Sequence, residues 1–468
     1  MPKIITILIK YIKSYTINLI LFILVLFFST YKLTSAQNIS LIQDAEIELY
    51  IRDWINPILK VAGLNPNSVN IYIVNDKSIN AFVAGGQNIF INTGLILAAK
   101  EVNALIGVLA HEIGHISGGH LNRTVNSMKR AQETVTIATI LTAGLMAASK
   151  AAGLDTPAGL AKLATLGPSI AERNFYKNTR QNEKYADAAA IKYMTAVNRS
   201  CIPLTKLLKK LGKQELLHEN RQDPYLRTHP ISQERIYDIV EATKNININY
   251  KKDLSLDNNK FQRIVAKIIA FTNSPGKTLL LYPKNSSQID AKYARAIAYL
   301  RLPDLDKGIK EIKELIHIDK NDPFFPEVFG QMLFENGQIF ESIEQLKISS
   351  ELLPNNPIIL LSLARSQIEY GKSKENNEAI LNLKKVLEIM PKNIAAWKLL
   401  SIGEARNNNL GLAQLASAEA YFLMGQHSLA IQFAEKAKIS FKKGSPSDIR
   451  ALDIIFFSKE KLMKINNN

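Results

Sequence analysis

The sequence contains a single cysteine, Cys201, among 468 residues. No disulfide can therefore form within the chain, and a lone cysteine is ordinarily a small apolar residue. Lysine and arginine exceed aspartate and glutamate, 58 to 42, which gives a formal net charge of +16. The cations are scattered, however, and no basic helix interleaved with aromatic residues is present, so we expect no nucleic-acid partner. The charge instead favours a general attraction to anionic membrane surfaces or acidic clients.

Long uninterrupted apolar runs are few, and one of them lies at the amino terminus. Lysines precede residues 17–28, INLILFILVLFF, and the small residues Thr34 and Ala36 precede Gln37. This order is typical of a secretory signal peptide, so we expect residues 1–36 to be cleaved and the remainder to be exported. An uncleaved anchor helix is the alternative, because the whole apolar stretch could nearly span a bilayer.

Residues 37–250 show the mixed pattern of an α+β domain that is mostly helical with a small sheet. The apolar residues predict helices and strands that are separated by glycine turns: helices at 41–64, 95–117 and 180–196, and strands at 69–76 and 88–93. A further run rich in Ala, Thr, Gly and Leu, 135–153, is shorter than the roughly 20 residues that a spanning helix needs. We interpret it as a helical hairpin that packs on the functional site or touches a membrane surface.

Residues 258–464 carry an internal repeat and are predicted to be entirely helical. Gly337 and Gly371 are 34 positions apart (371 − 337), and each precedes a periodic apolar run that closes on a proline. A period near 34 made of two helices is typical of tetratricopeptide repeats. Each helix pair buries its apolar face only against its neighbours, so the repeats stack into a solenoid. The polar, asparagine-rich segment 244–259 is the expected boundary between the two domains.

The segment 108–121, VLAHEIGHISGGHL, contains the pattern His-Glu-x-x-His. At about 100° per residue, His111 and His115 lie about 40° apart on one face of a helix. Two imidazoles at that spacing can converge on one tetrahedral zinc ion. Glu112 lies on the flank of this face, within reach of a zinc-bound water whose proton it can accept. Gly114 would let another element approach the helix closely.

A third ligand decides the class of such a site. His120 lies nine positions after His111 (120 − 111), roughly 180° around the helix, and Gly118–Gly119 are expected to end the helix before it. We therefore interpret His120 as a surface residue or as a neighbour of the ligands. Glu183 and Asp187 are spaced i and i+4 on a later helix. Glu183 could complete a His₂Glu site with one position open for water, and Asp187 could accept the free ring N–H of a ligating histidine.

The sequences HEIGH and NEKYAD, about seventy positions apart, resemble the HtpX and CAAX-prenyl-protease type of zinc metallopeptidase, and the segment 80–96 matches the pattern that precedes the motif helix in that type. The resemblance implies a gluzincin-type endopeptidase with zinc on His111, His115 and Glu183, and with Glu112 as the general base.

The resemblance also bears on the segment 226–236, LRTHPISQERI, which matches an Arg-x-His-Pro element of this type. It implies that His229 approaches the metal, either as a fourth, displaceable ligand or as a donor to the transition state. If His229 occupies the open position, the resting enzyme is self-inhibited.

The combination of export signal, peptidase motif and repeats is similar to periplasmic members of this type that act in quality control and assembly of outer-membrane β-barrel proteins. The resemblance implies that the clients are unfolded or misassembled outer-membrane polypeptides and that the repeats dock on the barrel-assembly machinery. One strand is interpreted as an edge strand to which an extended client adds as a further strand: Asn88, Ile89, Phe90, Ile91 and Asn92.

Three functions remain open from the sequence. The first is an exported zinc endopeptidase that recruits partners through its repeats. The second is a chaperone or scaffold whose metal site is latched or inactive. The third is an HtpX-like membrane peptidase in which residues 135–153 insert in lipid. The complete set of His111, Glu112, His115 and Glu183 favours the first, because a vestigial site would tend to lose a member.

Overall fold

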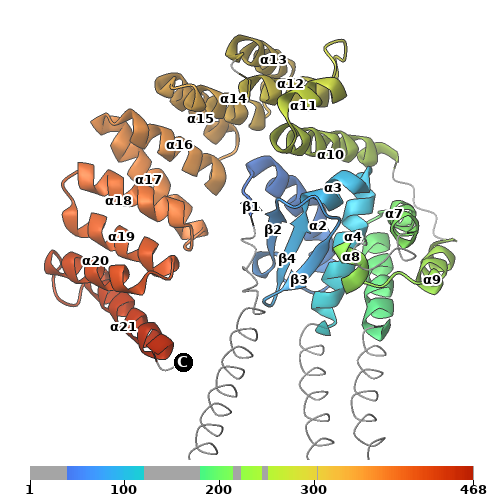
Figure 1. Ribbon diagram of the computed structural model, residues 1–468, viewed down its shortest axis with the longest axis horizontal. Helices are drawn as coiled ribbons and strands as arrows, with labels where there is room; N and C mark the ends of the chain where they lie inside the picture. Colours follow the sequence, from blue (N-terminus) through green and yellow to red (C-terminus); the bar gives the residue numbers. More distant parts are fainter. Residues whose placement is uncertain (1–39, 121–179, 214–222, 245–250, 303, 467–468) are drawn as a thin grey trace, which may run out of the picture. The chain divides into compact units, whose positions relative to one another are not determined.

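The computed structural model describes residues 40–120, 180–213, 223–244, 251–302 and 304–466 (Figure 1). The described elements belong to one compact unit, Leu41–Asn468. The expected signal peptide, 1–36, and the expected hairpin, 135–153, lie outside the described residues. Within the described ranges, no helix is both long and apolar enough to cross a membrane.

A four-stranded sheet forms the β part of the amino-terminal domain, with the strand order β1-β2-β4-β3. β2 and β4 run parallel, whereas β1 and β3 run antiparallel to their neighbours. In β4, Ile89 and Ile91 are buried. Alternate residues of this predicted strand therefore face the core, as the period of two in a strand requires. The strands are β1 (Leu41–Ile42), β2 (Asn70–Val74), β3 (Ala81–Ala84) and β4 (Asn88–Asn92).

The expectation that residues 88–92 form an edge strand is wrong. Phe90 is paired with Tyr72 of β2 on one side and with Phe82 of β3 on the other, and its ring stacks on both at centroid distances of 5.0 Å. The tight turn at Gly85–Gly86 folds β3 back along β4 and fills the position that a client strand would need. In the described part of the chain, β3 has no strand on its outer side.

The predicted helix 95–117 is two helices, because the chain turns at Lys100, whose φ is 59°, and at the extended Glu101. The first backbone N–H of the second helix, on Val102, donates to Asn258 Oδ1 at 3.0 Å. Asn258 belongs to the asparagine-rich segment, so part of that segment caps the motif helix. The helices of this domain are α2 (Ala45–Val61), α3 (Thr93–Ala99), α4 (Val102–Ser117), residues 180–196, α7 (Ile202–Gly212), α8 (Pro224–Thr228) and α9 (Gln233–Thr243).

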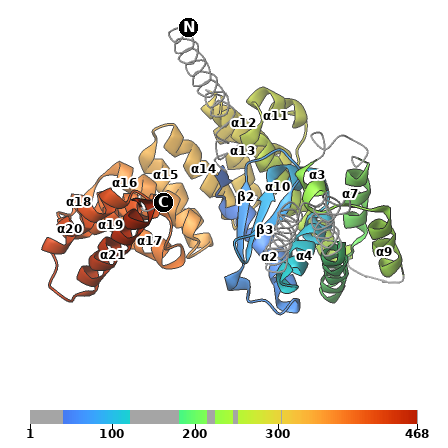
Figure 2. The same cartoon turned by 60° about the horizontal axis from the view of Figure 1, so that its bottom comes forward.

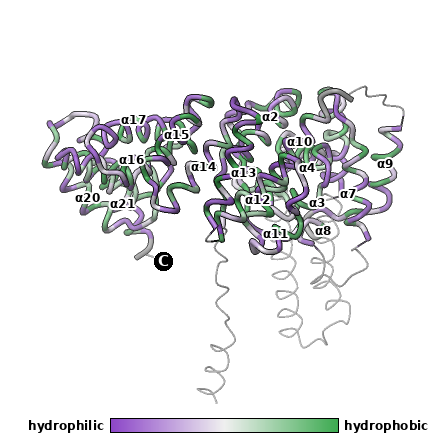
Figure 3. Tube along the Cα trace, turned by 90° about the horizontal axis from the view of Figure 1, so that it is seen from above, coloured by the Kyte–Doolittle hydropathy of each residue, from purple (hydrophilic) through white to green (hydrophobic). Residues whose placement is uncertain are grey.

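The rest of the described chain is an array of helix pairs in which consecutive helices pack side by side, as the tetratricopeptide pattern predicts (Figures 1 and 2). Polar and apolar residues alternate along these helices in Figure 3, as expected where each helix buries one face against its neighbours. The helices are α10 (Lys251–Thr272), α11 (Pro275–Leu281), α12 (Ile289–Leu300), α13 (Leu305–Ile318), α14 (Phe324–Glu335), α15 (Ile339–Leu352), α16 (Pro357–Tyr370), α17 (Ser373–Ile389), α18 (Ile394–Arg406), α19 (Leu410–Leu423), α20 (His427–Ile439) and α21 (Pro446–Asn466).

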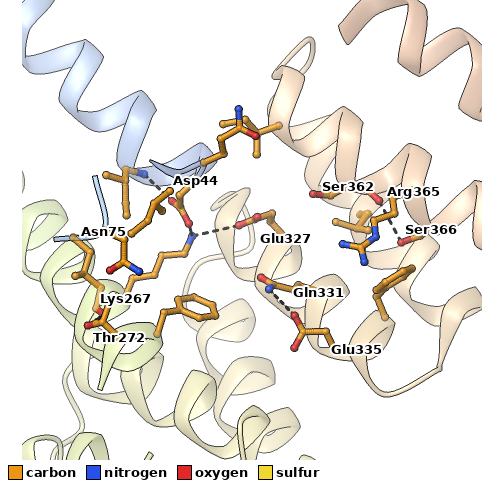
Figure 4. Close-up of a pocket in the computed structure, with 18 residues that line it drawn as sticks. Asp44, Asn75, Lys267, Thr272, Glu327, Gln331, Glu335, Ser362, Arg365 and Ser366 are labelled. Atoms are coloured by element: carbon orange, nitrogen blue, oxygen red, sulfur yellow. Dashed lines mark hydrogen bonds and ion pairs between the residues drawn. The ribbon is translucent and has the colours of Figure 1, made fainter. Parts of the chain in front are cut away.

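A buried ion cluster joins the start of α2 to α10 and α14 (Figure 4). Lys267 of α10 is 1% exposed, and its Nζ lies 2.7 Å from Asp44 Oδ2 and 3.4 Å from carboxylate oxygens of Glu46 and Glu327. A buried charge is stable only when it is paired, so these contacts hold the amino-terminal domain against the first helices of the array.

Candidate metal centre

Helix α4 presents the two motif histidines on one buried face, as the i, i+4 spacing predicts. His111 is 2% exposed, and its Nε2 lies 3.1 Å from Nε2 of His115. The two rings meet edge to face, with centroids 4.7 Å apart. Both Nε2 atoms therefore point at the same small volume, which is the arrangement that two imidazole ligands of one ion require.

The helix at 180–196 packs directly on α4 and brings the predicted carboxylate to this volume. A Cβ on Gly114 would lie 3.0 Å from Cα of Ala186, so only glycine allows the two helices to approach this closely. Glu183 is 3% exposed. Its Oε1 lies 3.3 Å from His115 Nε2, and its Oε2 lies 3.3 Å from His111 Nε2.

The loop that follows α8 adds His229 to the same group. Its Nδ1 lies 3.1 Å from Glu183 Oε1 and 3.4 Å from His111 Nε2. One ligand atom each from His111, His115, Glu183 and His229 lies within 4.8 Å of the other three. Three imidazoles and one carboxylate are the donor set that suits zinc, so the residues present fit a tetrahedral zinc site.

Glu112 is beside this group without belonging to it. Its carboxylate is 1% exposed, and its Oε1 lies 3.4 Å from Nε2 of His229. Burial raises the pKa of the Glu112 carboxyl above its ordinary value. A carboxylate with a raised pKa next to a metal site can accept a proton and return it, which is the task of a general base and acid.

Asp187 stands behind His111, as predicted. Its Oδ1 lies 3.0 Å from His111 Nδ1, on the side of the ring away from the ligand group. An imidazole that donates its Nδ1–H to a carboxylate keeps the lone pair on Nε2 free for a metal. The two motif histidines differ electrostatically, and an ion on Nε2 of His111 would take the place of the proton that this atom shares with Glu183. Burial opposes the charged form of His111, but hydrogen bonds to Asp187 and Glu183 raise its pKa to about 10, whereas burial lowers the pKa of His115 to about 3.

Arg235 is the residue of this centre that sequence reasoning missed. Its guanidinium donates to Asp187 from Nε at 2.7 Å and from Nη2 at 2.9 Å, and its Nη1 lies 2.9 Å from Glu183 Oε2. Nη1 also donates to the carbonyl of Pro230, the residue after His229, at 2.5 Å. The available signal was an arginine six positions after the histidine of the segment 226–236, at the start of an amphipathic helix, but its depth in the fold was not visible.

Comparisons with known proteins agree with this geometry. Residues 45–243 match the model of peptidase family M48. A putative beta-barrel assembly-enhancing protease of Vibrio cholerae is 25% identical over 441 residues, which covers 92% of this chain and 88% of that protein. The beta-barrel assembly-enhancing protease of Escherichia coli is 25% identical over 423 residues, which covers 88% and 82% of the two chains. The metalloprotease LoiP of Escherichia coli is 27% identical over 175 residues, which covers 37% of this chain and 62% of LoiP.

Solved structures were also compared with the chain. YrrB, described as a tetratricopeptide protein with an unusual peptide-binding site, is 18% identical, with a TM-score of 0.32, and is covered to 97% by 40% of this chain. Residues 45–243 thus form a domain that matches peptidase family M48, which indicates a metalloprotease, and the array of helix pairs follows this domain in the chain.

Proposed function

We propose that this protein is an exported zinc endopeptidase of the bacterial periplasm that acts on unfolded or misassembled outer-membrane polypeptides. The observation that carries the proposal is the convergence of His111, His115 and Glu183 beside the buried carboxylate of Glu112. The likeness to beta-barrel assembly-enhancing proteases over most of both chains supports the client class and the compartment.

In this proposal His111, His115 and Glu183 hold the ion. The chemistry that zinc supplies in such a site is Lewis-acid activation of water and of the scissile carbonyl. Glu112 takes the proton of the attacking water on a carboxylate oxygen and delivers it to the nitrogen of the leaving amine. Asp187 keeps the proton of His111 on Nδ1. The closed, buried setting of Glu112 strengthens these electrostatic interactions, because water is excluded.

His229 gives the centre a resting state in which the open position is filled. Its Nδ1 is within 3.4 Å of both Glu183 and His111, the distance expected of a fourth ligand. Cleavage would then require His229 to leave that position. From a neighbouring position, its ring could donate a hydrogen bond to the transition state. We expect His229→Ala to alter proteolysis while zinc stays bound; loss of zinc content would make His229 a structural ligand instead.

The same observation favours a second candidate function. A site that is permanently latched by His229 would leave the tetratricopeptide array as a chaperone or scaffold that recruits clients or the assembly machinery without cleaving them. The cation excess of the chain, +16, also allows peripheral contact with anionic membrane surfaces.

The decisive experiment measures zinc content and cleavage of casein, an unfolded protein, for the wild type and Glu112→Gln. We expect about one zinc per chain in both proteins and cleavage by the wild type alone. Zinc in both proteins without cleavage by either, together with retained client binding, would establish the scaffold. Absence of zinc from the purified wild type would refute the enzymatic account.

A further inference from the structure

We propose that His120 is a positioning residue for the metal centre: it holds Nδ1 of His115 and thereby aims Nε2 of His115 at the ion. The inference rests on the proposed zinc site, since it concerns how one of its ligands is oriented. His120 is not one of the four residues whose ligand atoms converge.

The contact itself is short and buried. Nδ1 of His120 lies 2.9 Å from Nδ1 of His115, and the two rings meet at an interplanar angle of 78°. His120 is 3% exposed, and its ring packs edge to face on Tyr185 of the helix at 180–196, with centroids 5.1 Å apart. The ring of His120 is therefore held between the two helices that supply the ligands.

The path of the chain explains how a residue past the end of α4 returns to its last turn. The helix ends at Ser117, and the N–H of Gly118 still bonds to the carbonyl of Gly114 at 2.9 Å. Gly119 has a φ of 63°, a left-handed conformation that reverses the chain. A Cβ on Gly118 would lie 2.4 Å from Nε2 of His120, so the space for the imidazole exists only because residue 118 has no side chain.

The contact fixes the tautomers of both rings. A short N–N contact needs one donor and one acceptor, and Nε2 of His115 must keep its lone pair to bind a metal. Nδ1 of His115 therefore carries the proton, and Nδ1 of His120 accepts it, which places the proton of neutral His120 on Nε2. His111 is oriented by a carboxylate, whereas His115 is oriented by a neutral ring that adds no negative charge to the centre.

The test compares zinc affinity, measured by competition with a chelator, in full-length Glu112→Gln protein with and without changes at His120. His120→Leu removes the acceptor, and we expect it to weaken zinc binding about 10- to 100-fold, the usual effect of losing the partner of a ligating histidine. His120→Gln retains a side-chain acceptor and should recover most of the affinity. The visible spectrum of the cobalt-loaded protein should change for His120→Leu and return toward that of the parent for His120→Gln.

Gly118→Ala provides a second route to the same result, because the added methyl group must displace the His120 ring. We expect it to weaken zinc binding in the same direction as His120→Leu. Gly276→Ala is the matched control, since no atom lies within 4 Å of its added Cβ, and it should leave zinc affinity unchanged. If His120→Leu keeps the zinc affinity and the cobalt spectrum of the parent protein, the role of His120 is overturned but the proposed function is not. If the parent protein binds no zinc, both are overturned.

Discussion

Oδ1 of Asp187 lies 3.0 Å from Nδ1 of His111, while both oxygens of the same carboxylate accept hydrogen bonds from Arg235. The histidine is thus held by an anion that is itself held by a cation. Hydrogen bonds to Arg235 and His111 outweigh burial and keep the pKa of Asp187 below its ordinary value. Asp187 is therefore charged throughout the pH range in which the enzyme would work, and it can fix the tautomer of His111 continuously.

Asp187→Asn should weaken zinc binding about 10- to 100-fold without unfolding the domain, because an amide of the same size can present its N–H group to His111 and select the wrong tautomer. Chelator competition measures the affinity. Asp238→Asn on α9 is the control, since the Asp238 side chain is 53% exposed and contacts only Lys184 among the ion pairs of the described residues. Equal zinc affinity in Asp187→Asn and the wild type would show that this carboxylate does not orient the ligand.

Arg235→Gln should destabilise the metal-free domain by about 3 to 5 kcal/mol, because it leaves the buried carboxylates of Glu183 and Asp187 without their shared cation. Chemical denaturation, performed with a chelator present, measures the change. Lys184→Gln on the helix at 180–196 removes an ion pair with Glu234 in which both side chains are largely exposed, 50% and 66%, so it should leave the free energy of unfolding nearly unchanged. A similar loss of unfolding free energy in the two variants would show that Arg235 does not stabilise the domain by pairing with Glu183 and Asp187.

The sequence was sufficient for those parts of the centre that depend on local periodicity. His111 and His115 share a face because they are one turn apart. The i, i+4 spacing of Glu183 and Asp187 lets Glu183 lie among the ligand atoms and Asp187 lie behind His111. Gly114 signalled the close approach of the second helix. These inferences needed only the geometry of a helix, which is the same wherever the helix lies.

Features that depend on tertiary packing were not visible in the sequence. The sequence predicted a strand at residues 88–92 correctly. The order of the strands depends on how the chain folds back at its turns, however, and β3 occupies the edge position that we expected for β4. Arg235 looked like an ordinary first-turn residue of an amphipathic helix, although it is 5% exposed. His120 lies far around an ideal helix from His111, and only the chain reversal at Gly119 returns it to His115.

The corrected strand order predicts where an extended client can add to the sheet. β3 is an edge in the described part of the chain, and it contacts α4, which carries His111 and His115. Neighbouring residues of a strand point their N–H groups to opposite sides, so proline at Val83 or at Ala84 removes an outward donor in one variant and a donor to β4 in the other. We expect the variant that loses the outward donor to keep the wild-type melting temperature but to cleave casein with kcat/KM about 5- to 10-fold lower. The other variant loses a hydrogen bond to β4 and should melt at a lower temperature. Unchanged casein cleavage by both variants would exclude strand addition on β3.

The ion cluster between α2, α10 and α14 predicts a pH-dependent stability. Burial raises the pKa of Glu327 to about 7, and the neighbouring Asp44 and Glu46 add to the rise although Lys267 opposes it. The unfolded chain has a glutamate pKa of about 4.3. Between these values the folded protein holds a proton that the unfolded chain releases, so the stabilisation is complete below about pH 4.3 and is lost as the pH rises through about 7.

Glu327→Gln removes this titration, because an amide of the same shape stays neutral at every pH. The melting temperature of the variant relative to the wild type should therefore rise from pH 6 to pH 8, because the folded wild type loses its proton over this interval and must then bury a further negative charge beside Asp44 and Glu46. Melting curves of both proteins at the two pH values, with a chelator present to exclude effects of metal binding, measure the difference. Glu335→Gln is the control on the same helix, since Glu335 is exposed, and its offset from the wild type should be the same at both pH values. An equal offset for Glu327→Gln at pH 6 and pH 8 would mean that Glu327 remains ionised in the folded protein, and that Lys267 neutralises the cluster without a bound proton.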